Sequence, residues 1–179
     1  DVWTFSAPSV LMMYHRTAGG ANSENAEMKD CMPYYYQVSD GHGNGSEHSF
    51  EADLFYERGQ LIDADISNQM ALSAARRKNQ FSIMMCCNFL SMRMAVLNGD
   101  FSEMNKISLE SRELLYKEQE YTLLNTLDMC LGFIYALLGH PELAPKWMAE
   151  GQIDEALVMF PATPMLHTFY NQLLLAQGE

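Results

Sequence analysis

Basic residues are scarce in this chain of 179 residues. Lysine and arginine together number 11, against 23 aspartates and glutamates, so the formal net charge is −12 at pH 7. Such a charge repels the phosphate backbone of DNA or RNA, and no basic stripe in the sequence offsets the repulsion. We therefore expect no direct nucleic-acid binding by this segment.

Long apolar runs are also missing. The longest candidate, Met129–Leu138, contains Gly132 and is too short to cross a bilayer, which takes about 20 apolar residues. The first residues, Asp1–Phe5, lack the basic start of a signal peptide. We expect a cytoplasmic protein without a membrane partner. Because the chain has no initiator methionine, we also expect it to be a fragment of a longer protein.

Constellations of reactive side chains are absent as well. The four cysteines form no C-x-x-C pair, and adjacent Cys86 and Cys87 cannot easily bond to each other, which favours a reduced compartment. No two of the five histidines are spaced i, i+4, and the sequence H-E-x-x-H does not occur. We expect a protein that is not an enzyme and that carries no metal and no cofactor.

Five glycines, in contrast, recur at a nearly constant interval. They are Gly20, Gly59, Gly99, Gly139 and Gly178, and the gaps are 39, 40, 40 and 39 residues. A fixed period of this size is typical of helical solenoids, in which each unit needs its neighbour to bury its apolar face. We predict an all-α fold, a helical-hairpin solenoid (α-α superhelix) with about four repeats.

The glycines also divide the chain. An apolar helix is expected before each glycine, because glycine ends helices readily, and a second helix after it. Asp65–Arg77 and Asn105–Glu118 are predicted as such second helices, and Gly151 is predicted to open a third that Pro161 stops. We expect one helical-repeat domain over 1–179, made of an irregular unit 1–46, repeats at about 47–79, 80–119 and 120–160, and a partial unit 161–179.

The repeats resemble a known family. Leu131-Gly132-x-x-Tyr135 before Gly139, and Gly59-Gln60-Leu61-x-x-Ala64, are similar to the tetratricopeptide repeat. In that family a small residue lets paired helices approach, and an alanine occupies their closest crossing. The chain departs from the pattern in its longer period and in an insertion, His140–Glu150.

Longer segments resemble the middle region of large LuxR-family bacterial regulators. They are Pro33–Tyr36, the glycine loop 41–47 and Asn125–Gly139. The resemblance implies a tetratricopeptide-like sensor region, whose partners in the parent protein are an ATP-binding switch domain and a helix-turn-helix domain. Neither an ATP-binding motif nor a DNA-reading helix is present in this chain. A generic peptide-binding tetratricopeptide scaffold without a transcriptional role is the alternative function.

Candidate ligand-binding residues follow from the solenoid, whose first helices line the concave face. We predict that this face binds a small polar molecule or a peptide, with a wall of aromatic side chains. An ordinary wetted helix face is the alternative for this surface, and packing is the alternative role of the tyrosines. The candidates are Tyr34, Tyr35, Tyr36, Asn88, Arg93, Asn125 and Asp128.

The glycine-rich segment Asp40–Ser46 admits two interpretations. Its glycines favour a plain connection between helices. The alternative is a loop whose backbone amides bind an anion at the start of the next helix.

Overall fold

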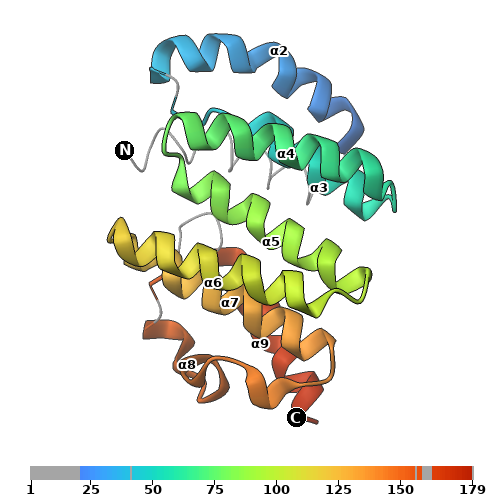
Figure 1. Cartoon of the computed structure of the whole chain (residues 1–179), viewed down its shortest axis with the longest axis vertical. Helices are drawn as coiled ribbons and strands as arrows, with labels where there is room; N and C mark the ends of the chain where they lie inside the picture. Colours follow the sequence, from blue (N-terminus) through green and yellow to red (C-terminus); the bar gives the residue numbers. More distant parts are fainter. Residues whose placement is uncertain (1–20, 41, 156, 159–162, 179) are drawn as a thin grey trace. The chain divides into compact units, whose positions relative to one another are not determined.

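A computed structural model describes residues 21–40, 42–155, 157–158 and 163–178 (Figure 1). These residues are all-α and contain no strand, which confirms the all-α part of the predicted fold. None of their helices is long and apolar enough to cross a membrane. In chain order the helices are α2 (Ala21–Ser39), α3 (Ser46–Glu57), α4 (Leu61–Arg77), α5 (Phe81–Leu97), α6 (Phe101–Lys117), α7 (Tyr121–Leu137), the 3-10 helix η1 (Pro141–Leu143), α8 (Lys146–Ala149), the 3-10 helix η2 (Gln152–Glu155) and α9 (Thr163–Gln177).

The helix-and-turn unit repeats at half the interval that the glycines suggest. Helices α4, α5, α6 and α7 each have 17 residues. Every turn before, between and after them is centred on a left-handed residue, with φ between 51° and 75°. These residues follow one another every 20 positions: Gly59, Asn79, Gly99, Gln119 and Gly139.

All five turns close through the same backbone hydrogen bond. The amide after the left-handed residue donates to a carbonyl five residues earlier, as Gln60 does to Phe55, Gln80 to Ala75 and Glu120 to Leu115, each at 2.9 Å. This bond satisfies a carbonyl that the helix end would otherwise leave unpaired. The left-handed centre is therefore required in every turn, whether or not it is a glycine.

This requirement predicts that Gln119→Gly stabilises the protein. A side chain in the left-handed region destabilises the folded state by about 1–2 kcal/mol, and glycine removes this strain. Part of the resulting stabilisation is lost, because glycine also gives the unfolded chain more conformational entropy. We expect the free energy of unfolding in urea to rise by about 0.5–1 kcal/mol. Glu118→Gly, at the preceding residue, is the control and should give no gain. Equal effects of the two changes would contradict the prediction.

Two predicted helix starts are wrong. Helix α4 begins at Leu61, not Asp65, and α6 begins at Phe101, not Asn105. Asp63 and Glu103 lie in the first turns of these helices, where a negative charge stabilises the helix dipole. In α6 the Asp100 carboxylate also accepts the backbone amide of Glu103 at 2.9 Å.

Contacts divide the chain after Met104 into two compact units. In the first, α3 and α5 both pack on α4, and consecutive helices form antiparallel hairpins. Fully buried alanines let the backbones approach closely: Ala52 on α3, and Ala64, Ala71 and Ala75 on α4. Ala64, the alanine of the tetratricopeptide-like pattern, is among them.

In the second unit α7 is the central helix. It is buried on most sides, and α9 packs against it, with the rings of Phe133 and Phe169 stacked at 4.0 Å. The helix predicted after Gly151 is wrong, because η2 is a single 3-10 turn and residues 157–158 are not helical. Only a short helix fits between Gly151 and Pro161, and short helices are marginal without packing.

Candidate functional site

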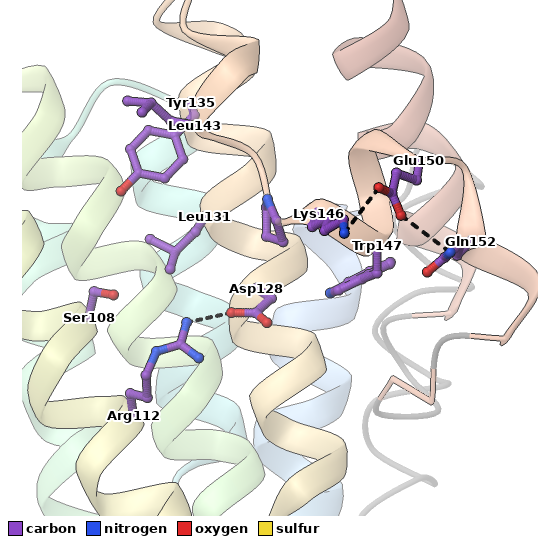
Figure 2. Close-up of a pocket in the computed structure, with 11 residues that line it drawn as sticks. Ser108, Arg112, Asp128, Leu131, Tyr135, Leu143, Lys146, Trp147, Glu150 and Gln152 are labelled. Carbon is purple, nitrogen blue, oxygen red and sulfur yellow. Dashed lines mark hydrogen bonds and ion pairs between the residues drawn. The ribbon is translucent and has the colours of Figure 1, made fainter.

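A pocket of about 760 Å³ lies within the second unit (Figure 2). Helices α6 and α7 form one side of it, and the segment from η1 to η2 forms the other. The residues that line it include Arg112, Asp128, Leu131, Lys146, Trp147 and Glu150.

The insertion that interrupts the repeat builds this pocket. Residues 140–150 do not continue the helical pattern but fold back onto α7 as η1 and α8. Met148 of α8 is fully buried, and Gly132 of α7 gives it room. A Cβ at position 132 would lie 2.6 Å from the Met148 sulfur and 3.1 Å from Cδ of Pro145. Gly132, the small residue of the tetratricopeptide-like pattern, thus provides the space into which Met148 and Pro145 of the insertion pack.

Two ion pairs face the pocket from opposite sides. On the helical side Arg112 of α6 pairs with Asp128 of α7, and both side chains are about a quarter to a third exposed, at 33% and 22%. On the other side Lys146 pairs with Glu150 at 3.6 Å, and Gln152 donates to the same carboxylate at 3.3 Å. The pocket therefore presents both signs of charge, and its charged lining is balanced.

Aromatic side chains complete the lining. Tyr135 comes from α7 and Trp147 from α8, and Figure 2 shows the Trp147 indole nitrogen turned toward Asp128. This nitrogen is buried, and no acceptor among the described residues pairs with it. A buried donor without an acceptor costs about 1–3 kcal/mol.

The two predicted ligand-binding residues of α7, Asn125 and Asp128, lie in different environments. Asp128 lines the pocket, whereas Asn125 donates from its side chain to the carbonyl of Leu157 at 3.0 Å. The other lining residues were not predicted. For those in the insertion the signal was the insertion itself, since a break in a regular repeat that carries a tryptophan and two prolines marks a separate local structure; for Arg112 on α6 there was no such signal in the sequence.

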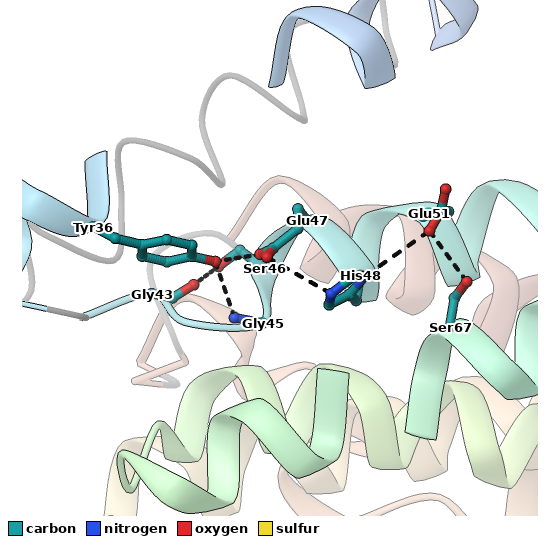
Figure 3. A network of polar contacts seen from close by, with 8 residues as sticks. All are labelled: Tyr36, Gly43, Gly45, Ser46, Glu47, His48, Glu51 and Ser67. Carbon is teal, nitrogen blue, oxygen red and sulfur yellow. Dashed lines mark hydrogen bonds and ion pairs between the residues drawn. The ribbon is translucent and has the colours of Figure 1, made fainter. Parts of the chain in front are cut away.

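The three predicted tyrosines lie in the first unit and differ in exposure. Tyr34 is 73% exposed, whereas Tyr35 and Tyr36 are half-buried beside Met32 and Phe50. Figure 3 shows the Tyr36 hydroxyl donating to Glu47 and accepting the amide of Gly45 at 3.2 Å. Burial, together with the hydrogen bond to Glu47, raises the pKa of Tyr36. Tyr36 thus holds the loop between α2 and α3, and ligand binding by the three residues stays a prediction.

Two glycine amides of the loop, those of Gly43 and Gly45, already have acceptors inside the protein. Besides the Gly45 amide, the amide of Gly43 donates to the side chain of Gln80 at 2.8 Å, and Ser46 donates from its hydroxyl to the Gly43 carbonyl at 2.7 Å. Amides that already have acceptors in the protein are poor anion ligands. These contacts favour the plain connection over the anion-binding loop.

Arg93 and Asn88 both lie on α5 in the first unit. The Arg93 guanidinium bonds Asp53 at 3.3 Å and Glu57 at 2.9 Å, and it lies 4.0 Å from the centre of the Tyr56 ring. It therefore connects α5 to α3. Asn88 is half-buried five residues earlier in the helix.

The described residues offer little for covalent or metal chemistry. They contain no group of three or more side chains that could hold a metal ion. Cys87 is buried, and burial raises the pKa of its thiol to about 12, which keeps it protonated at neutral pH. The arrangement is suited to binding through hydrogen bonds, ion pairs and aromatic contact.

No family profile, no curated protein and no solved structure matches this chain. The pocket and the repeat pattern are therefore the observations from which a function is inferred.

Proposed function

We propose that this chain is a non-catalytic ligand-binding sensor region of a LuxR-type transcriptional regulator, built as a tetratricopeptide-like solenoid. The regular 20-residue helix-and-turn unit and the buried Ala64 support the solenoid. The resemblance of Pro33–Tyr36 and Asn125–Gly139 supports the regulator. The proposed ligand is a small polar molecule or a peptide.

The pocket of the second unit carries the proposal. It combines an apolar contact, Leu131, with two aromatic rings and two ion pairs, the mixture expected of a site that orients a small polar ligand. Of the predicted residues, Asp128 is the one that lines it. In the parent protein a ligand that binds one arrangement of the domains more tightly would shift the ATP-binding switch toward that arrangement.

A peptide-binding scaffold without a transcriptional role is the second candidate. Arg112 and Lys146 favour it, because tetratricopeptide-like peptide sites use basic side chains to hold a carboxylate. The sequence of the flanking gene distinguishes the two candidates. A phosphate-binding loop upstream and a helix-turn-helix downstream support the regulator, and their absence supports the scaffold.

A thermal-shift screen tests the pocket itself. Sugars, amino acids and short peptides are added to wild type, to Asp128→Asn and to the control Asp65→Asn, whose residue is exposed on α4. A true ligand at about 100 times its Kd stabilises by about 2.7 kcal/mol, which raises Tm by roughly 5–10 °C. We expect this shift in wild type and in the control, and a much smaller one in Asp128→Asn. A ligand that stabilises all three proteins equally binds elsewhere, and a screen without any shift contradicts the proposed function.

A further inference from the structure

We propose that the pocket of the second unit recognises a zwitterion, namely an α-amino acid with an apolar side chain or a dipeptide with both termini free. The proposal rests on the proposed function and names the ligand class of that same site. In this arrangement the carboxylate of the ligand pairs with Arg112 and Trp147, its ammonium group pairs with Asp128, and its side chain lies on Leu131 and Pro145, all of which line the pocket.

The balance of charge is the first reason. Arg112 and Lys146 line the pocket together with Asp128 and Glu150, and among the described residues no other lining side chain is charged. A ligand that carries only a carboxylate or phosphate brings an uncompensated negative charge beside two acids, in a chain of net charge −12. A ligand that carries only a positive charge competes for Asp128 and Glu150, and it offers Arg112 and Lys146 no anion in exchange. A zwitterion brings one charge of each sign, so that its carboxylate can pair with a basic side chain and its ammonium group with an acidic one.

The tryptophan is the second reason. The Trp147 indole nitrogen can only donate, and it has no acceptor among the described residues. A carboxylate oxygen of the ligand would accept this N–H beside Arg112, and hydrogen bonds to charged groups are the stronger kind. An ammonium group alone cannot do so, because it has no lone pair to accept with.

The apolar part of the lining is the third reason. Leu131 and Pro145 line the pocket, and so does Leu143, whose side chain is 55% exposed. Covering an exposed leucine removes apolar surface from water at about 25 cal/mol per Å². An aliphatic side chain on the ligand would gain this contact, whereas glycine or serine would not.

The test is calorimetric titration of the whole chain with L-leucine and with analogues that each lack one charge. L-leucinamide lacks the carboxylate, and N-acetyl-L-leucine lacks the ammonium group. We expect measurable binding of L-leucine and at least tenfold weaker binding of either analogue. Two dipeptides distinguish the sources of the chemistry, since leucylglycine presents a leucine amino terminus and glycylleucine a leucine carboxyl terminus. A dipeptide that binds more tightly than leucine supports the dipeptide form of the proposal.

Variants of the site give a second measurement. Trp147→Phe keeps the ring and removes the donor, so we expect it to weaken L-leucine at least fivefold without changing the far-ultraviolet circular dichroism. Glu110→Gln, an exposed change on α6, is the matched control and should bind like wild type.

The outcomes separate this inference from the proposed function. If a neutral sugar shifts wild type but not Asp128→Asn while L-leucine binds to neither, the zwitterion proposal is overturned and the sensor proposal stands. Equal affinity for leucine and leucinamide also overturns it. If no compound of the screen shifts the Tm of wild type, both proposals are wrong.

Discussion

Met148→Ala is expected to lower the free energy of unfolding by about 2–5 kcal/mol, the usual cost of truncating a large buried side chain to alanine. Met148 is fully buried, although α8 has only four residues and cannot be stable by itself. The side chain is therefore the main anchor of the insertion on α7. Urea unfolding followed by circular dichroism measures the change.

Met70→Ala is the matched control, because Met70 is 48% exposed on α4. Its effect should stay within about 0.5 kcal/mol. If Met148→Ala costs no more than Met70→Ala, the insertion is not held by Met148. The same variant should also weaken any ligand of the pocket, since Trp147 and Lys146 stand beside position 148.

Gly132→Leu is the second large effect that we expect. A Cβ at this position would already lie 2.6 Å from the Met148 sulfur and 3.1 Å from Pro145 Cδ, and leucine adds three further carbons. The proline ring cannot rotate away as the methionine can. Overpacking of this kind typically costs about 1–3 kcal/mol, which exceeds the gain of up to about 1 kcal/mol from replacing glycine in a helix. A lower midpoint of thermal unfolding is the measurement.

A double-mutant cycle locates the clash. Gly132→Ala and Met148→Ala are made singly and together, and the combined loss should be smaller than the sum of the two, because the shortened side chain at 148 vacates the space that the new methyl group needs. Additive effects would show that the two positions do not meet. An unchanged stability of Gly132→Leu would place Gly132 outside the contact.

Much of the fold could be predicted because turn chemistry is local. Gly59, Gly99 and Gly139 mark helix ends through their left-handed φ, and the apolar runs before them are helices as expected. The alternate turns were missed because Asn79 and Gln119 adopt the same conformation with side chains that also occur in other structures. The division into one solenoid domain stays a prediction.

The candidate site was predicted less completely, because neighbours in space decide what a polar side chain does. Tyr36 and Arg93 were chosen as ligand contacts, and both are engaged inside the protein, with Glu47 and with Asp53 and Glu57. Asp128 does face a pocket, but its partner Arg112 lies on another helix. Nothing in the spacing of the sequence connects those two residues.

By itself the sequence determined the helical class, the positions of the glycine turns and the acidic charge, because each of these depends on residue type and short-range spacing. Only the tertiary structure decided that the insertion 140–150 returns to α7, that Gly132 accommodates Met148, and that Arg112, Asp128 and Trp147 surround one pocket. Those contacts join segments far apart along the chain. They form because burying Met148 against a helix without a side chain at position 132 removes apolar surface from water, which no local pattern encodes.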